Sequence, residues 1–183
     1  NQVRTAFDLA RAAGIKYINS DVILGLPGED LDDLDYTLSE LAKLAPENIT
    51  VHSLALKRAA QWGNNVSDLD LQQTLGQQMA SLTKQYMAQM GQIPYYLYRQ
   101  RYILSDLENI GYAIPGAESL YNIQMMEERQ TIIGIGGGAI TKFVNGDLTV
   151  VRHANPKCPA TYQQQIETLI STKKSQIRQY LLV

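Results

Sequence analysis

Tyr17-Ile-Asn-Ser-Asp-Val-Ile-Leu-Gly-Leu-Pro-Gly-Glu29 is the stretch of this chain that decides the fold. It begins as a short apolar run bounded by Gly and Pro, which is typical of a parallel strand covered on both faces. The run then passes through a Gly-Pro turn into an acidic helix start. Ligands bind beyond the carboxyl ends of such strands in barrels and open α/β sheets, so we expect a binding site here.

Asp21 is the polar exception within this strand. A buried carboxylate costs free energy unless it is paired or hydrogen-bonded. Two interpretations follow, because either a ligand satisfies Asp21 or a salt bridge or backbone group does. The sequence alone leaves both open.

Helix and strand patterns alternate through the first half of the chain. Apolar spacing predicts a helix over residues 3–13 that stops at Gly14, a second over 31–45 that ends at Pro46, and a third over 71–90 that Gly91 ends. Residues 49–56 read as a second strand. The order α-β-α-β-α predicts an α/β fold and matches the last third of a parallel barrel sheet.

The second half changes character. We expect a short aromatic strand over residues 95–100, a loop over 106–120 and one or two helical turns over 123–129. Residues 131–144 and 148–152 flank Asn145-Gly146, which predicts an antiparallel hairpin whose two turn positions accept positive φ. After a loop over 156–159, a helix over 166–181, with a break expected near Ser175, closes the chain.

Composition limits the functional classes. The 183 residues have a net charge of −2 and 45% hydrophobic content. This composition gives no excess of positive charge of the kind that binds nucleic acid or an anionic membrane. No apolar stretch approaches the roughly 18 residues of a membrane span. The single cysteine, Cys158, excludes an internal disulfide framework and fits a reducing cytoplasm. Together with His153 it supplies too few ligands for a structural zinc site, so we expect no metal site here.

The glycine-rich stretch Gly134-Ile-Gly136-Gly-Gly-Ala139 imitates a dinucleotide fingerprint. That fingerprint must follow a strand and open a helix, whereas the Asn-Gly turn follows here. We interpret the glycines as sites of close backbone approach.

Five segments carry a resemblance to a known family. Residues 19–29 resemble the fifth strand, and residues 51–58 the sixth strand, of the radical S-adenosylmethionine (SAM) barrel in the oxygen-independent coproporphyrinogen III oxidase (dehydrogenase) family. Residues 95–100 and 108–113 are similar to the segment after that barrel, and residues 126–139 to its glycine-rich strand. The ordered series covers nearly the whole chain.

The resemblance implies a fold and cofactors. Residues 1–91 would form the end of a partial (β/α) barrel with two β/α units, and residues 92–183 an α+β extension that holds the hairpin. The family binds SAM and a four-iron (4Fe-4S) cluster through a Cys-x3-Cys-x2-Cys loop that this chain lacks. Asn1 opens the chain directly on a helical pattern. We therefore expect the C-terminal portion of a longer protein that is inactive by itself and exposes an edge for self-association.

The resemblance also implies site residues. Asp21 would accept hydrogen bonds from the SAM ribose, with Asn19 on the same strand face. The adenine of SAM would lie against Ser53, Leu54 and Ala55. Asn109, Ile110 and Ile140 resemble positions that line the cofactor and substrate pocket, with Asn109 to Tyr112 as a turn. Better-known oxidases carry Gln where this chain has Ile110, which leaves the tetrapyrrole substrate open.

Other polar and aromatic residues have two interpretations each. His52 is either a hydrogen-bonded packing residue or a ligand or base. The tyrosines either wall a planar tetrapyrrole or bury area in strands; they are Tyr95, Tyr96, Tyr98, Tyr102, Tyr112 and Tyr121. Arg99 and Arg101 either pair with propionates or lie on a solvated face.

Three functional classes follow. The first is a parent enzyme of haem synthesis that oxidatively decarboxylates coproporphyrinogen III propionates to give protoporphyrinogen IX. The second is a haem-binding chaperone on the same barrel, and the third is a non-catalytic piece. The electron donor is left open in each case, and this chain itself is expected to contribute no catalytic residue.

Overall fold

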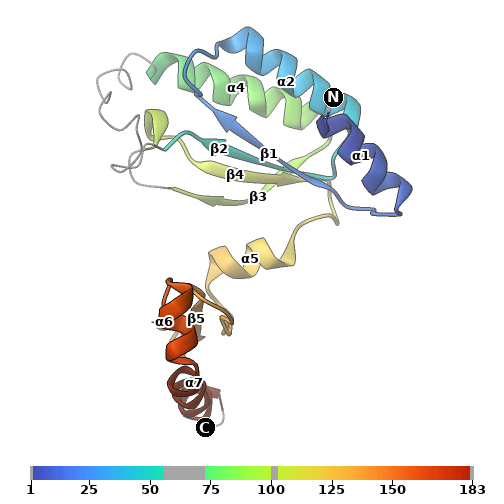
Figure 1. The fold of residues 1–183 in the computed structure, drawn as a ribbon. Helices are drawn as coiled ribbons and strands as arrows, with labels where there is room; N and C mark the ends of the chain where they lie inside the picture. The colour runs from blue at the N-terminus through green and yellow to red at the C-terminus, as the bar shows by residue number, and fades with distance from the viewer. Residues whose placement is uncertain (1, 56–72, 100–102, 182–183) are drawn as a thin grey trace. The chain divides into compact units, whose positions relative to one another are not determined.

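The computed structural model describes residues 2–55, 73–99 and 103–181. The chain separates into two compact units, Asn1–Ile123 and Gln124–Val183. The first unit holds a mixed sheet and its helices, and the second holds a hairpin and two helices, so the fold is α/β (Figure 1). The division into 1–91 and 92–183 stays a prediction about domains, whereas the compact units divide after Ile123.

The first unit is built on a four-stranded sheet with the order β1-β2-β4-β3. β1 (Asn19–Leu24) and β2 (Asn48–Ser53) pair in parallel, with α2 (Leu31–Leu44) as their connection. β4 (Asn109–Ala113) pairs antiparallel with both β2 and β3 (Ile93–Tyr98). The two predicted parallel strands are therefore confirmed. The loop predicted over 106–120 is wrong, because it contains β4.

Two helices, α2 and α4 (Gln73–Gln89), lie side by side over one face of this sheet (Figure 1). The core between them is apolar; it comprises Val22, Leu24, Leu34, Leu38, Leu41, Ile49, Val51, Met79, Met87 and Tyr112. Burial of such side chains drives folding at roughly 25 cal/mol per Å². The expectation that β1 is covered on both faces is wrong, since Asn19, Asp21 and Ile23 are exposed.

Helix ends in the first unit follow the sequence. Asp30 caps α2 by accepting hydrogen bonds from the N–H groups of Asp32 (2.9 Å) and Asp33 (3.1 Å), and the Asp33 carboxylate accepts one from Asp30 N–H (3.2 Å). Ala45 ends the helix in the left-handed region at φ 48°. α1 (Gln2–Ala12) ends before Gly14, as predicted.

Arg11 and Glu47 tie α1 to the start of β2. The guanidinium donates to both Glu47 carboxylate oxygens, at 2.7 and 2.8 Å, and Ile18 N–H donates to one of them at 2.9 Å. Burial opposes ionisation of Glu47, but these hydrogen bonds outweigh it and lower the pKa of the carboxyl. The ion pair thereby fixes the chain entering β1.

The second unit contains the predicted hairpin, formed by β5 (Ile140–Val144) and β6 (Val150–Ala154). Its turn differs from the prediction, because the positive φ falls on Leu148 (64°) and not on Asn145 or Gly146. Asn145 N–H donates to Thr149 O (3.0 Å) and Leu148 N–H to Asn145 O (2.9 Å). The hairpin thus closes over three residues, Gly146 to Leu148, and the last of them is in the left-handed region.

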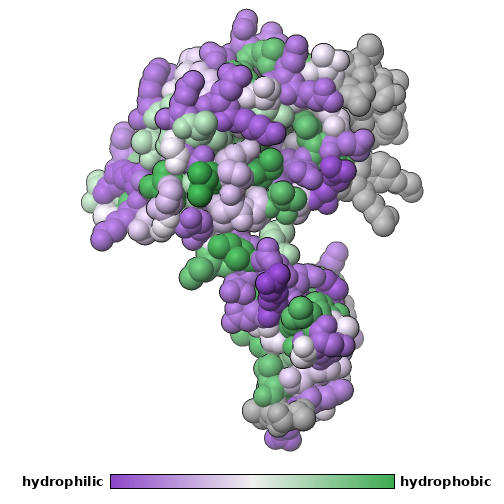
Figure 2. Space-filling view, turned by 180° about the vertical axis from the view of Figure 1, so that it is seen from behind, coloured by the Kyte–Doolittle hydropathy of each residue, from purple (hydrophilic) through white to green (hydrophobic). Residues whose placement is uncertain are grey.

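Three helices complete the described elements, besides the short turn η1 (Leu104–Asp106). α5 (Leu120–Glu127) matches the predicted helical turns, α6 (Pro159–Gln164) was not predicted, and α7 (Ile166–Leu181) runs without the expected break at Ser175. None of the described helices is long and apolar enough to cross a membrane. Figure 2 shows hydrophilic side chains over much of the visible surface, with hydrophobic groups in small patches between them.

Candidate functional site

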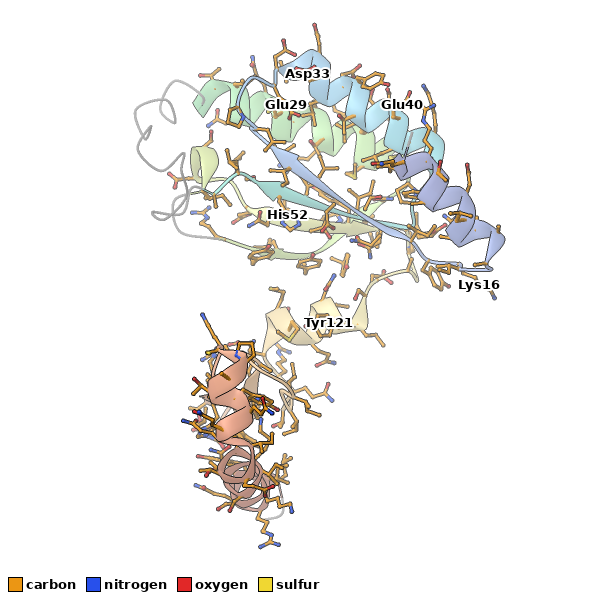
Figure 3. All side chains as sticks on the ribbon, in the orientation of Figure 1. Lys16, Glu29, Asp33, Glu40, His52 and Tyr121 are labelled. Carbon is orange, nitrogen blue, oxygen red and sulfur yellow. The ribbon has the colours of Figure 1, made fainter. Side chains whose placement is uncertain are left out.

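The sheet face turned away from α2 and α4 carries a set of polar side chains that we call the polar face; it comprises Asn19, Asp21, Asn48, Thr50, His52, Tyr96 and Tyr98. Register places them together, since Asp21 pairs with Thr50, Thr50 with Gly111, and Gly111 with Tyr96. Strand alternation puts their side chains on one side. Figure 3 shows His52 on this side, away from Glu29 and Asp33 at the start of α2.

Asp21 lies near the middle of β1 on the polar face. Its side chain is 59% exposed, so the predicted buried carboxylate is wrong. Asn19 Nδ2 donates to Asp21 Oδ1 at 2.7 Å, which confirms that the two residues share a strand face. The second oxygen, Oδ2, lies 3.6 Å from His52 Nε2. Asp21 therefore has partners in the protein and free acceptor capacity as well.

His52 lies between Asp21 and Tyr98 and is 29% exposed. Its Nδ1 lies 3.3 Å from the hydroxyl of Tyr98, and the two rings meet edge to face with centroids 6.5 Å apart. His52 is therefore a hydrogen-bonded residue of the polar face with one ring edge toward Asp21.

Tyr96 lies across from Gly111 on the polar face. A Cβ at Gly111 would overlap Cε1 and Cδ1 of the Tyr96 ring and lie 2.6 Å from its Cζ. The Tyr96 hydroxyl lies 3.3 Å from Thr50 Oγ1, and its ring is nearly parallel to that of Tyr98. Burial raises the pKa of Tyr96, so its hydroxyl stays protonated. Sequence reasoning missed Thr50 and this Gly–Tyr pair, because only the strand register brings them together.

The predicted adenine wall follows β2 at its carboxyl end. Ser53 is buried, and its N–H donates to Asn109 Oδ1 at 2.9 Å. Leu54 N–H donates to Leu24 O at 3.0 Å, and Ala55 forms an isolated bridge with Ile103. These residues thus hold the strand ends together, and their adenine contact stays a prediction.

The predicted turn from Asn109 to Tyr112 is strand β4, which corrects the expectation. Asn109 is 1% exposed, and it both accepts from Ser53 N–H and donates to Tyr98 O at 3.4 Å. Ile110 packs against the core on the helix-covered face, opposite to Gly111. Strand alternation thus puts Asn109 on the same side of the sheet as Gly111 and the polar face, where it connects β2 to β3, and puts Ile110 on the opposite side.

Ile140 lies in β5 of the second unit and is 48% exposed. A Cβ at Gly134 would lie 2.6 Å from the carbonyl carbon of Ile140, so the glycine-rich stretch contains the predicted close backbone approach. Lys173 Nζ donates to Gly134 O at 2.6 Å and to Thr141 Oγ1 at 2.8 Å. Desolvation lowers the pKa of this ammonium.

The tyrosines predicted to line a tetrapyrrole site lie in different environments. Tyr96 and Tyr98 belong to the polar face, whereas Tyr112 is buried in the core and Tyr121 is exposed on α5. Arg99 lies 3.5 Å from Glu108, an ion pair at the surface. Tyr102 and Arg101 lie outside the described residues.

The described part of the chain contains no group of three or more His, Cys, Asp or Glu that could hold a metal ion. Cys158 is exposed at the start of α6, and His153 Nδ1 lies 2.8 Å from Gln176 Nε2. Neither residue belongs to a ligand cluster.

Comparisons with known proteins give two curated relatives, while no protein-family model matches the chain. It is 43% identical over 179 residues to the oxygen-independent coproporphyrinogen-III oxidase-like protein HemZ of Bacillus subtilis, covering 94% of this chain and 35% of HemZ. It is 26% identical over 148 residues to the heme chaperone HemW of the same bacterium, covering 81% of this chain and 36% of HemW. The chain thus spans about a third of the length of the curated relatives it matches.

Among solved structures, the chain is similar to HemN from Escherichia coli, described as a coproporphyrinogen III oxidase and a radical SAM enzyme. The TM-score is 0.62 at 18% identity, and the match covers 91% of this chain and 37% of that one. This likeness shows a shared fold. Together with the similarity to HemZ, it confirms the resemblance predicted from the sequence.

Proposed function

We propose that this chain is part of a radical SAM protein of the oxygen-independent coproporphyrinogen III oxidase family, and that its polar face lines the cofactor site. The observation that carries the proposal is Asp21, a 59% exposed strand carboxylate on the polar face whose Oδ2 lies 3.6 Å from His52 Nε2, beyond a normal hydrogen bond. The 43% identity to HemZ over nearly the whole chain supports the family.

Asp21 fits the ribose of SAM. An ionised carboxylate is acceptor-only, with more lone pairs than Asn19 uses, so it can accept hydrogen bonds from ribose hydroxyls. Asn19 orients the carboxylate through its 2.7 Å hydrogen bond. Ser53 is buried, so Leu54 and Ala55 are the residues that would meet the adenine. When bound, SAM and the iron–sulfur cluster supply the radical chemistry that removes hydrogen from a substrate.

A four-iron cluster does not fit the residues of this chain. Such clusters are held by cysteine thiolates, and the sequence has the single cysteine Cys158. Cys158 lies in the compact unit that does not contain the polar face. In this proposal the parent protein holds the cluster with residues other than these.

The partial barrel is the architecture that we infer for the parent. β1 is an edge strand of the sheet, and beside it lies a cavity of about 520 Å³ between β1, α1 and α2. A further β/α unit packed at this edge would pair the strand and fill the cavity. The polar face would then turn toward the barrel interior.

The substrate class that we propose is a tetrapyrrole. In the leading proposal the parent oxidatively decarboxylates coproporphyrinogen III propionates to protoporphyrinogen IX in the cytoplasm, with an electron donor still to be identified. The alternative is haem transfer, favoured by the 26% identity to HemW. The higher identity to HemZ supports the oxidase as the leading proposal.

Asp21→Ala in the longer protein that contains this chain tests the proposal. A hydrogen bond to a charged group contributes about 1.5 to 3 kcal/mol, so SAM affinity should fall about ten-fold to a hundred-fold while cluster content is unchanged. Calorimetric titration measures the affinity, and a thermal melt reports stability. Asp8→Ala, which removes an exposed carboxylate from α1, is the matched control. Unchanged affinity with a lowered melting temperature would show that Asp21 is only a structural partner.

A further inference from the structure

Asp21 and His52 face each other across β1 and β2 without touching. The 3.6 Å between Asp21 Oδ2 and His52 Nε2 exceeds a normal hydrogen bond. It is short enough for one oxygen atom to lie about 2.8 Å from both. The two strands thus hold an acceptor and a ring nitrogen at the spacing that a single hydroxyl bridges.

Tyr98 and Asp21 together select which nitrogen of His52 carries the proton. If Nδ1 carried it, the lone pair of Nε2 would face the carboxylate, and the two acceptors would repel each other. With the proton on Nε2, the Tyr98 hydroxyl donates to Nδ1 across 3.3 Å, and the Nε2–H points toward Asp21. His52 therefore presents a donor beside an acceptor.

Asn19 assigns the two carboxylate oxygens different roles. Its amide occupies Oδ1 at 2.7 Å, which leaves Oδ2 toward His52. At 59% exposure for Asp21 and 29% for His52, a ligand can reach both groups.

We propose that Asp21 and His52 form a clamp for one hydroxyl of a vicinal diol. The hydroxyl oxygen accepts the hydrogen bond from His52 Nε2–H and donates its own proton to Asp21 Oδ2, while the neighbouring hydroxyl donates to a remaining lone pair of Asp21. The inference rests on the proposed function and deepens it, since the diol is the ribose of SAM. His52 is then a binding residue, and Tyr98 is a positioning residue that acts through it.

The experiment compares ligands with and without each hydroxyl in the full-length, anaerobically prepared holoprotein. The probes are S-adenosylhomocysteine and its 2′-deoxy and 3′-deoxy analogues, titrated by calorimetry into wild type, His52→Ala, His52→Gln, Tyr98→Phe and Asp21→Ala. A thermal melt of each variant keeps loss of folding apart from loss of binding.

We expect His52→Ala to weaken S-adenosylhomocysteine binding about three-fold to ten-fold and to leave one of the two deoxy analogues unchanged, because a neutral hydrogen bond has been lost. His52→Gln, which keeps a donor, should restore part of the affinity. Tyr98→Phe should cause a smaller loss of about two-fold. It removes the hydroxyl that favours the proton on Nε2 of His52, but the His52 ring itself stays in place.

Equal weakening of all three ligands in His52→Ala, or no weakening of any, overturns the clamp. If Asp21→Ala still weakens binding in that case, the proposed function stands without the clamp. If Asp21→Ala also leaves S-adenosylhomocysteine affinity unchanged, the proposed function fails, and the clamp fails with it. The two failures are thus distinguishable.

Discussion

Gly111→Ala should destabilise the first unit by crowding the Tyr96 ring on the polar face. The new Cβ would overlap two ring atoms of Tyr96 and lie 2.6 Å from a third. Gly111 has no positive φ, so the backbone itself accepts Ala. The substitution therefore isolates the steric conflict across the β3–β4 pair.

The expected cost depends on how the Tyr96 ring responds. If the ring stays in place, overpacking of this kind costs about 1 to 3 kcal/mol. If the ring rotates away, the clash is relieved, but the hydrogen bond between Tyr96 and Thr50, worth about 0.5 to 1.5 kcal/mol, is lost. We therefore expect the free energy of unfolding to fall by about 0.5 to 3 kcal/mol.

Urea unfolding of wild type, Gly111→Ala, Tyr96→Ala and the double variant measures this effect. The double variant should be more stable than the sum of the single losses predicts, by about 1 to 2 kcal/mol, because Ala at 96 removes the ring that clashes. Gly146→Ala is the matched control, since nothing lies within 4 Å of its added Cβ. Additive losses, or a Gly111→Ala protein as stable as the control, would refute the packing of Tyr96 over Gly111.

Three further outcomes follow from the structure. Anaerobic reconstitution of this chain with iron and sulfide should yield no stoichiometric four-iron cluster by metal analysis, because one thiol cannot replace three. Glu128 accepts from Lys142 and Arg152, which lower its pKa, so its stabilising effect is present above the unfolded-state pKa and is lost as pH falls through the folded-state pKa. Wild type should thus exceed Glu128→Gln in urea midpoint at neutral pH and lose that advantage as pH falls through the lowered folded-state pKa of Glu128. The edge strand β1 predicts self-association of the isolated chain, and light scattering that shows a strict monomer at all concentrations would contradict it.

Elements with strong local patterns could be predicted from the sequence, and β4 could not. The spacing of leucines gave α2, and Asn145-Gly146 located the hairpin. Asn109–Ala113 carries a central Gly and precedes Pro115, which locally favours a loop. It becomes a strand because β2, which is distant in the sequence, and β3 pair with it on either side.

The turn of the hairpin shows the same limit at a smaller scale. Asn-Gly favours a two-residue turn with positive φ at both positions, yet the chain closes over a longer loop with Leu148 in the left-handed region. Asp147 accounts for part of this choice, since its carboxylate accepts from both the N–H (3.0 Å) and the hydroxyl (2.7 Å) of Thr149. Side-chain hydrogen bonds of this kind compete with the backbone preference of the Asn-Gly pair.

Asp21 shows how an apolar run can hide a polar face. The burial of β1 follows strict alternation, with Val22 and Leu24 toward the helices and Asn19, Asp21 and Ile23 away from them. Ile23 made the stretch read as apolar on both faces, although it is 44% exposed here. The chemistry of Asp21 then depends on His52 and Tyr98, which the pairing of β2 with β1 and β4, and of β4 with β3, brings to the same face. A carboxylate in a strand is therefore best judged by the residues opposite it in the sheet, because those neighbours determine whether it is a paired structural group or an acceptor with lone pairs left for a ligand.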